Sequence, residues 1–482
     1  MSGMKLFFDT FSQPSRAVLI LCHAYKIPFE PKLIKIGEME HQTNEEFAKV
    51  CASRTVPAID DDGFKLFESA AIMKYLVCKH KLPDHWYPAD LKQQAKIDEY
   101  LHWHHSTLRM GITPIIFNKV LLPKKTGQPP NEVIIRASEK ILEKSLKLLE
   151  SHFLKDTKFI NSDSISIADL QAVCELTQFW MAGVDPVADK PRLSQWLTDC
   201  QKELAPHFDQ VHEAVYSVRD KGTFKGMLLS SSFHSCELEG VERAATPTFD
   251  CKLKMAGLKL FFDAFSQPCR AVLILCHANR IPFEPKLIKI AKMEHQTDEE
   301  FTKVCATRTV PAIDDNGFKL FESAAIMKYL VCKHKLPDHW YPADLQQQAK
   351  IDEYLHWHHA NLRMGAAPIV FYKALLPKMT GQPPNEEMIR TSEKILKKSL
   401  KLLDGHFLKD TKFINSDSIS IADLQAVCEL TQFWVAGVDP VADKPRLSQW
   451  LTDCQKELAP HFDQVHKAIY TARDRGTFKG KL

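Results

Sequence analysis

Short apolar runs alternate with amphipathic segments along the first 80 residues. Four runs have the length and composition of strands: 6–8, 31–34, 56–60 and 64–67. Two segments carry apolar residues at helical spacing: 14–25 and 69–79. Asp61-Asp62-Gly63 separates the last two strands and predicts a hairpin. This order predicts a mixed four-stranded sheet with flanking helices, of thioredoxin-like shape.

From Asp90 onward the pattern changes to helical spacing throughout. Five segments are predicted to be helices: 94–108, 130–153, 167–182, 193–201 and 208–218. Ser166 and Asp169 have the spacing of a capping box, in which each side chain accepts a hydrogen bond from the other's backbone N–H, with Ile165 and Leu170 placed as a hydrophobic staple. We therefore expect a second, all-helical domain whose capping motif is structural, contributing about 1 kcal/mol.

The whole pattern occurs twice. The run 5–9 returns at 259–263, and the offset of 254 residues then holds to the end with about 85% identity. A repeat this long is far outside the 20 to 50 residues of solenoids, so it indicates a duplicated protein. The predicted domains are 4–81 and 90–225 in copy 1, and 258–335 and 344–479 in copy 2.

Residues 229–257 show neither helical nor strand spacing and are predicted to be a linker. A flexible chain of about 29 residues spans roughly 30 Å, enough for the two copies to pair within one molecule; pairing of each copy with another chain stays open. Met255-Ala256-Gly257 also resembles the start of an independent chain, so the alternative hypothesis is that the fusion is a gene-model artefact.

The composition narrows the class of function. The 482 residues, 45% hydrophobic and 26% charged, predict a folded protein of two to four domains. Lys+Arg 63 against Asp+Glu 60 leaves a net charge of +3, which disfavours nucleic acid as a partner. The 13 Cys form no C-x-x-C pair, so we expect reduced thiols. No secretory signal or membrane span is recognisable, and a cytoplasmic location is expected.

The first candidate for chemistry is Ser12, in the turn Ser12-Gln13-Pro14 that repeats with Ser266. Pro14 suits the first turn of a helix. Ser12 is therefore expected beside the positive end of a helix, where an anion would be held against its hydroxyl. A plain N-cap serine is the alternative.

Two further segments carry groups that suit a peptide ligand. A proline at Val56-Pro57 sets a bend, is a candidate for a cis bond, and leaves the Val56 backbone free to pair with an extended peptide. Glu68-Ser69 stands where a strand passes into a helix, so that a carboxylate and an ammonium group of a ligand both find partners there. A helix-capping pair is the alternative for Glu68 and Ser69.

Taken together, these motifs resemble the theta class of the glutathione transferases. The resemblance covers both copies and rests on these segments: Ser-Gln-Pro-x-Arg at 12–16, Glu-x-x-His at 38–41, Arg-Thr-Val-Pro-Ala at 54–58, Glu-Ser-x-Ala-Ile at 68–72, Trp-Tyr-Pro at 86–88, and Ile-Ser-Ile-Ala-Asp-Leu at 165–170. It implies a thioredoxin-like domain and a helical bundle in each copy, with glutathione as co-substrate and small electrophiles as partners.

The resemblance implies that Ser12 and Ser266 are catalytic and stabilise the glutathione thiolate. The implied glutathione-binding residues are Gln13, His41, Thr55, Val56, Pro57, Glu68 and Ser69 in copy 1, and Gln267, His295, Thr309, Val310, Pro311, Glu322 and Ser323 in copy 2. His41 would contact the glycyl carboxylate, Val56 the cysteinyl segment, and Glu68 with Ser69 the γ-glutamyl group. A lysine of the family is replaced by Thr55 and Thr309, which predicts weaker binding.

The resemblance also implies an acceptor pocket for the electrophile. Four residues are expected to line it: Trp103, Arg109, Trp357 and Arg363. Differences between the copies gather nearby, which predicts different electrophile preferences: Ser106/Ala360, Thr107/Asn361, Ile112/Ala366, Thr113/Ala367 and Asn118/Tyr372. His102 and His105 lack a third ligand at a recognisable spacing, so no metal is expected. A non-catalytic binding protein and a glutathione-dependent peroxidase are the alternative functions.

Overall fold

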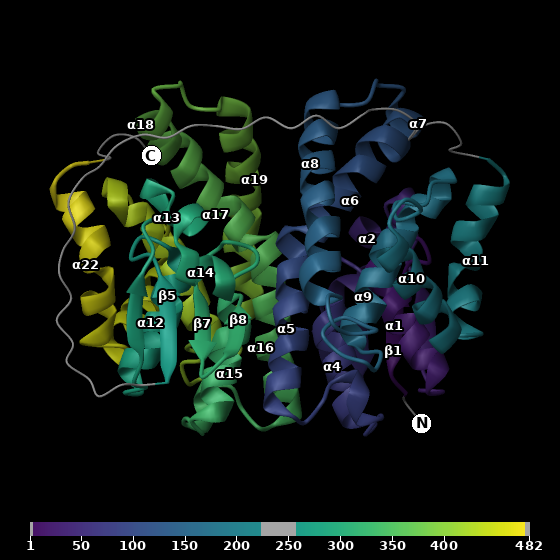
Figure 1. Cartoon of the computed structure of the whole chain (residues 1–482), viewed down its shortest axis with the longest axis horizontal. Helices are drawn as coiled ribbons and strands as arrows, with labels where there is room; N and C mark the ends of the chain where they lie inside the picture. The colour runs from purple at the N-terminus through teal and green to yellow at the C-terminus, as the bar shows by residue number, and fades with distance from the viewer. Residues whose placement is uncertain (1–2, 223–256, 478–482) are drawn as a thin grey trace. The chain divides into compact units, whose positions relative to one another are not determined.

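The computed structural model describes residues 3–222 and 257–477, drawn in colour in Figure 1. The chain divides into two compact units, 1–235 and 236–482. Within each, a sheet domain precedes a helical domain, which confirms the predicted fold class and its duplication. The predicted linker 229–257 lies outside the described residues except for Gly257, and so do the ends of both helical domains.

Unit 1 opens with a four-stranded sheet in the order β2-β1-β3-β4. Strands β1 and β2 are parallel, and β3 and β4 form the predicted hairpin. The elements of this domain are β1 (Lys5–Phe8), α1 (Gln13–Ala24), β2 (Glu30–Leu33), η1 (Ile36–Glu38), α2 (Glu40–Thr43), α3 (Glu45–Val50), β3 (Ala58–Asp61), β4 (Phe64–Phe67) and α4 (Ser69–Lys79). Buried Leu6 and Phe7 place β1 in the core.

The second domain of unit 1 is helical, as predicted. Its elements are η2 (Asp84–Trp86), α5 (Leu91–Ser106), α6 (Leu108–Ile116), η3 (Phe117–Leu121), α7 (Leu122–Thr126), α8 (Glu132–Leu148), η4 (Leu149–Phe153), α9 (Ile167–Leu176), η5 (Thr177–Ala182), α10 (Pro191–Glu203) and α11 (His207–Asp220). Helices α9 and α11 pack against α1, so the helical domain rests on the first helix of the sheet domain.

Unit 2 repeats this order. Its elements are β5 (Leu258–Phe262), α12 (Gln267–Ala278), β6 (Glu284–Leu287), η6 (Ile290–Lys292), α13 (Glu294–Thr297), α14 (Glu299–Val304), β7 (Ala312–Asp315), β8 (Phe318–Phe321), α15 (Ser323–Lys333), η7 (Asp338–Trp340), α16 (Leu345–Ala360), α17 (Leu362–Val370), η8 (Phe371–Leu375), α18 (Leu376–Thr380), α19 (Glu386–Leu402), η9 (Leu403–Phe407), α20 (Ile421–Leu430), η10 (Thr431–Ala436), α21 (Pro445–Glu457) and α22 (His461–Asp474).

The capping box at the start of α9 is present as predicted. Both oxygens of the Asp169 carboxylate are engaged: Oδ2 accepts from the Ser166 backbone N–H at 3.0 Å, while Oδ1 accepts from Trp196 Nε1 and the Ile160 N–H, both at 2.9 Å. The Asp423 carboxylate makes the same contacts in unit 2. This buried network anchors the helical domain of each unit.

Several boundaries differ from the sequence prediction. The segment 94–108 is longer at its start, because Asp90 caps α5 by accepting the Lys92 and Gln93 N–H groups. It also ends earlier, since Thr107 leaves the helical region of backbone space and α6 begins as a separate helix. Helices α2, α3, α6 and α7 were not predicted.

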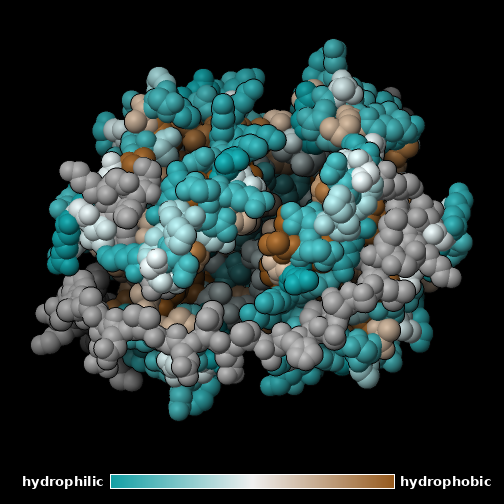
Figure 2. All heavy atoms as spheres, turned by 90° about the horizontal axis from the view of Figure 1, so that it is seen from above, coloured by the Kyte–Doolittle hydropathy of each residue, from teal (hydrophilic) through white to brown (hydrophobic). Residues whose placement is uncertain are grey.

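Figure 2 shows a face on which most described side chains are hydrophilic.

Gly111 allows α6 to approach α8 closely. An added Cβ at Gly111 would lie 2.8 Å from the backbone N and Cα of Leu142 in α8. The backbones of α6 and α8 therefore touch at a point where only glycine fits. Gly365 meets Leu396 in the same way in unit 2, with the backbone N at 2.5 Å.

Candidate active site

The register of the sheet gathers the predicted site residues of unit 1 at one end of three strands. Phe7 in β1 pairs with Ala58 in β3, which pairs with Phe67 in β4. The turn before α1 follows β1, the Val56-Pro57 bend directly precedes β3, and the Glu68-Ser69 junction directly follows β4. Because these strand ends lie at the same edge of the sheet, three segments that are about 10 to 60 residues apart in sequence lie close together there.

Ser12 forms the N-cap of α1, with Pro14 in the first turn. The turn before it is fixed by Asp9: the Asp9 backbone C=O accepts the Ser12 N–H at 3.0 Å, and its carboxylate accepts the N–H groups of Phe11 at 2.7 Å and Ile36 at 2.8 Å. The Ser12 hydroxyl is thereby held next to the N-terminus of α1, where the helix dipole favours an anion. Gln13 follows it and is also buried.

The Val56-Pro57 peptide bond is cis, as the sequence indicated it could be, and so is Val310-Pro311 in unit 2. Both Val56 and Pro57 are buried directly before β3. Thr55 lies just outside this bend, where its hydroxyl is 2.6 Å from that of Ser53.

Glu68 precedes α4 in a backbone conformation that side chains rarely adopt, with φ at 70°, and Glu322 has φ at 68°. Such strain is concentrated at functional sites. Ser69 follows as the first residue of α4 and donates its hydroxyl hydrogen to Gln171 Oε1 in α9, at 3.0 Å. The junction between β4 and α4 is thus tied directly to the helical domain.

His41 lies in the short helix α2. Arg54 Nη1 donates to the backbone C=O groups of His41 and Gln42, at 3.4 and 3.0 Å, which fastens α2 to the segment before Val56. Burial lowers the pKa of His41, and Lys125 and Arg54 lower it further, against the opposing effect of Asp9. His41 Nδ1 is buried and, among the described residues, has no hydrogen-bond partner.

Unit 2 places the equivalent residues at the same edge of its sheet, since Phe261, Ala312 and Phe321 pair in the same register. Its predicted site comprises Ser266, Gln267, His295, Thr309, Val310, Pro311, Glu322 and Ser323. The Ser323 hydroxyl is 3.2 Å from Gln425 Oε1, and those of Thr309 and Thr307 are 2.7 Å apart. Burial lowers the pKa of His295, with Asp263 opposing and Arg308 adding to the effect.

Arg16 connects the Ser12 turn to the helical domain. Its guanidinium is fully buried and donates through Nη1 to Phe11 C=O at 3.1 Å, and through Nη2 to Cys174 C=O at 2.9 Å and Gln178 Oε1 at 2.8 Å. One residue therefore holds both the turn and α9.

Arg109 and Arg363, two of the residues predicted to line the acceptor pocket, each pair with a buried glutamate. Arg109 Nη1 contacts Glu175 Oε1, and Arg363 Nη1 lies 3.1 Å from Glu429 Oε2. Burial raises the pKa of Glu175, but Arg109 and His104 outweigh it and hold this pKa below its ordinary value. The Arg109 side chain is 29% exposed, so it lies at the border between this buried pair and solvent.

Trp103 and Trp357 are buried within the helical domains. The Trp103 ring centroid lies 4.7 Å from that of Phe153 and 5.6 Å from that of Tyr100, and Trp357 packs on Phe407 and Tyr354 in the same way. Their indoles are buried among these aromatic rings, and their place at the acceptor pocket stays a prediction. The helical spacing of apolar residues in α5 and α16 explains why both tryptophans are buried.

Sequence reasoning missed Asp9, Glu175 and Gln178. Asp9 ends a strand and was visible only as part of the repeat, while Glu175 and Gln178 follow the capping box without a motif of their own. A charged residue within the apolar run 165–176 was the available signal, because a buried carboxylate requires a cation.

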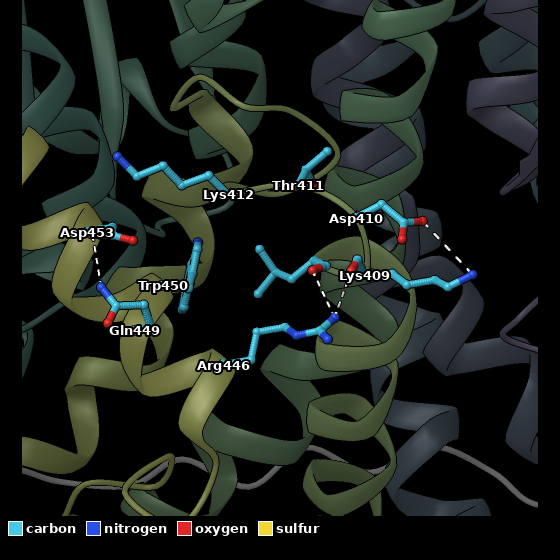
Figure 3. Close-up of a pocket in the computed structure, with 9 residues that line it drawn as sticks. Lys409, Asp410, Thr411, Lys412, Arg446, Gln449, Trp450 and Asp453 are labelled. Atoms are coloured by element: carbon cyan, nitrogen blue, oxygen red, sulfur yellow. Dashed lines mark hydrogen bonds and ion pairs between the residues drawn. The ribbon is translucent and has the colours of Figure 1, made fainter.

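Beyond the predicted site, the described residues bear on three further points: metal-binding groups, membrane-spanning helices and hollows. Among residues 3–222 and 257–477, no group of His, Cys, Asp or Glu has the arrangement of a metal site, and no helix is long and apolar enough to cross a membrane. A hollow of about 480 Å³ in unit 2 is shown in Figure 3, lined by Leu408, Lys409, Asp410, Thr411, Lys412, Arg446, Gln449, Trp450 and Asp453. None of these residues belongs to the predicted site.

Comparison with known proteins agrees with this architecture. Residues 2–78 and 260–338 match the N-terminal domain of glutathione S-transferase, and 112–203 and 366–457 match its C-terminal domain. Glutathione S-transferase theta-1 of Bos taurus is 40% identical over 219 residues, covering 45% of this chain and 91% of that protein. Glutathione S-transferase T1 of Arabidopsis thaliana is 41% identical over 232 residues, covering 46% and 92%.

Among solved structures, human glutathione-S-transferase T1-1 in its apo form matches with a TM-score of 0.43 and 37% identity, covering 45% of this chain and 91% of that one. The chain belongs to the glutathione S-transferase family, as a tandem duplication whose relatives include theta-class members. The family resemblance stated from the motifs is confirmed.

Proposed function

We propose that each unit is a glutathione transferase in which the hydroxyl of Ser12 or Ser266 donates a hydrogen bond to the glutathione thiolate. The thiol proton passes to solvent when glutathione binds. The thiolate sulfur then forms a bond to an electrophilic carbon, while a halide leaves, an epoxide opens, or an activated alkene takes up a proton. Family membership supports the overall reaction, and the place of Ser12 at the N-terminus of α1 supports its role.

The physical reason lies in the acidity of the thiol. A thiol of ordinary pKa, about 8.5, is mostly protonated at neutral pH, and only the thiolate is a strong nucleophile. A hydrogen bond to a charged group contributes about 1.5 to 3 kcal/mol, which corresponds to a decrease of about one to two pKa units. The N-terminus of α1 acts in the same direction.

The remaining residues of the edge suit the other parts of the tripeptide. His41, whose Nδ1 is buried without a partner among the described residues, would bind the glycyl carboxylate beside Thr55. The Val56-Pro57 bend would pair with the cysteinyl backbone, and Glu68 with Ser69 would hold the γ-glutamyl ammonium and carboxylate. Gln13 would complete the site next to Ser12. The equivalent residues of unit 2 take the same roles.

An apolar surface beside Ser12 supports a hydrophobic electrophile. Phe11 and Ile36 are both exposed and both bound through their N–H groups to Asp9, and exposed Met39 follows three residues after Ile36. Arg109 would face the acceptor only with the part of its side chain that Glu175 leaves exposed. We expect the copy differences on α6, such as Thr113/Ala367, to give the two units different electrophile preferences.

The test is a pH titration of thiolate absorbance for glutathione bound to the full-length protein and to the Ser12→Ala/Ser266→Ala double variant. We expect a bound-thiol pKa well below that of free glutathione, rising by about one to two units in the variant. Binding without a lowered pKa would instead support a non-catalytic binding protein. Cys22→Ala, a buried thiol elsewhere on α1, is the control and should leave the titration unchanged.

A further inference from the structure

Ser69, the proposed partner of the γ-glutamyl carboxylate, is held from the helical domain of its own unit. Its hydroxyl donates to Oε1 of Gln171 in α9 at 3.0 Å, although the two residues are 102 positions apart in sequence. The side chains of Ser69 and Gln171 are 5% and 2% exposed, and α4 packs against α9. A buried glutamine of one domain therefore controls the hydroxyl of a site residue in the other.

In unit 2 both ends of the glutamine amide lie within hydrogen-bonding distance of the serine. Ser323 Oγ is 3.2 Å from Oε1 of Gln425 and 3.2 Å from its Nε2. The amide oxygen only accepts hydrogen bonds, whereas the NH2 group only donates them. Two directions of the bond are thus open to this pair: the serine donates to Oε1, or Nε2 donates to the serine oxygen.

The direction matters because a serine hydroxyl has one hydrogen to donate. An ionised carboxylate only accepts, so Ser69 binds one by giving it that hydrogen. In unit 1 this hydrogen points to Gln171 Oε1. When Gln171 rotates its amide and becomes the donor, the hydrogen is released to a ligand, and the buried serine oxygen keeps a partner.

We propose that Gln171 in unit 1 and Gln425 in unit 2 are positioning residues that reverse their hydrogen bond to the serine when glutathione binds. Nε2 of the glutamine then donates to the serine oxygen, and the serine donates to the γ-glutamyl carboxylate. Each bond polarises the other, so the serine becomes a stronger donor than it would be alone. The proposal rests on the proposed function of Ser69 and Ser323 in binding this carboxylate.

The surroundings of Ser69 suit a carboxylate for a second reason. Ser69 is the first residue of α4, a helix of 11 residues with no acidic side chain in its first turn. The N–H groups and the dipole at this end of the helix attract an anion. A neutral glutamine is the fitting partner there, because an acidic residue in its place would repel the ligand.

The experiment measures binding to the full-length chain by calorimetry, with two probes. One is glutathione, and the other is an analogue in which hydrogen replaces the α-carboxylate of the γ-glutamyl group. Gln171→Met and Gln425→Met are made together, since methionine keeps the length of the side chain but has no donor. We expect the dissociation constant of glutathione to rise about fivefold, as for the loss of one hydrogen bond, and that of the analogue to stay constant.

The control exchanges Gln195 and Gln449, at exposed positions of α10 and α21, for methionine and should change neither dissociation constant. The pKa of the bound thiol should also keep its wild-type value in the Gln171→Met/Gln425→Met variant, because the contact lies at the other end of the tripeptide.

Two further sets of variants test the path and the direction of the effect. In a Ser69→Ala/Ser323→Ala background the methionine exchanges should cause no additional loss, because the glutamine acts through the serine. Gln171→Glu with Gln425→Glu installs a side chain that, once ionised, only accepts and retains the serine hydrogen. At pH 8 this pair should raise the dissociation constant of glutathione at least about tenfold, with a smaller rise in the alanine background.

A loss confined to glutathione and to proteins that retain the serines would support the proposal. Equal losses for glutathione and the analogue, or an undiminished loss in the alanine background, would overturn it and leave the proposed function intact. If the wild-type chain does not bind glutathione, the proposed function fails and this inference fails with it. Should the glutamate variants not fold, the methionine pair decides.

Discussion

The turns before α1 and α12 share almost every residue, yet they are held differently. In unit 1, Gln178 accepts from Arg16 and donates through Nε2 to Phe11 C=O at 3.2 Å and Met181 Sδ at 3.1 Å. In unit 2 the position of Met181 is Val435, and Gln432 Oε1 is buried without a partner among the described residues. An unchanged glutamine thus makes different contacts in the two units, so identical residues do not guarantee identical contacts.

The capping-box network shows the opposite behaviour. Asp169 and Asp423 make the same four contacts at closely matching distances, and every partner residue is identical in the two units. The duplicated chain therefore contains both a region that stayed constant and one that diverged.

The largest effect is expected at the constant network. In Asp169→Asn the remaining amide oxygen can still accept from Ile160 and Trp196, but the amide NH2 group faces the Ser166 N–H and hydroxyl, which are donors. We therefore expect the unfolding free energy to fall by about 3 kcal/mol. Asp423→Asn should cost the same. Urea unfolding of the full-length chain measures both, with Asp163→Asn at a surface turn as the control. Clearly unequal losses would mean that the two networks are not equivalent.

Removing the charge of Glu175 should have the next largest effect. Glu175→Gln leaves His104 and Arg109 without their carboxylate, and because Arg109 is partly solvated we expect a loss of about 2 kcal/mol. The pKa of Glu175 is lowered in the folded protein, so its contribution is present above the ordinary value of 4.5 and is lost as the pH falls through the folded value. The difference between wild type and variant should accordingly shrink below pH 4.5.

The same change in unit 2 sharpens the comparison. Gln267 Nε2 donates to Glu429 Oε1 at 3.4 Å, so Glu429→Gln should also raise the KM for glutathione in that unit, whereas Glu175→Gln should alter stability alone. Glu143→Gln, an exposed surface change, is the control for both. Equal KM changes in the two units would refute the difference at Gln267.

Met181→Val should reproduce in unit 1 the environment found in unit 2. The variant loses the sulfur that accepts from Gln178 as well as buried apolar volume, with an expected cost of about 1 kcal/mol. Ile116→Val is the matched control, since it makes another natural exchange at a buried position without a polar contact. If thermal unfolding shows no greater loss for Met181→Val than for this control, the sulfur contact contributes nothing.

The smallest effect concerns Lys125, whose counterpart in unit 2 is Met379. Lys125 lowers the pKa of His41, so Lys125→Met should move that pKa upward toward its ordinary value. Loss of an exposed cation near the glycyl end should also raise the KM for glutathione by about twofold. Kinetics in the Ser266→Ala background measure this at several salt concentrations, with Lys92→Gln as control; a KM that stays constant would remove Lys125 from the site.

The sequence predicted the elements that local signals define. The bounds of α4 agree with the prediction, and the hairpin and the capping box are where turn and cap residues place them. Helix α6 was missed because Gly111 and Pro114 disfavour a helix locally, and its packing against α8 is a long-range effect. Strand order was equally invisible, since it depends on pairing between distant segments.

The candidate site was predictable as a set of motifs and not as a network. Ser12, Val56 and Glu68 stand beside strand ends, so the sheet had to bring them to one edge once its topology was known. The buried partners Glu175 and Gln178 come from α9 and η5 in the other domain, and no spacing in the chain relates them to Ser12. The different contacts of Gln178 and Gln432 arise from packing around identical residues.

The contact at Gly111 has a consequence for how the duplicated units evolve. Because the backbones of α6 and α8 meet there without side chains between them, the path of α6 is set by a residue that cannot be exchanged. Positions next to it have diverged, as at Ile112/Ala366 and Thr113/Ala367, while Gly111 and Gly365 have not. Selection can therefore vary the chemistry of this helix residue by residue, on a backbone that remains in place.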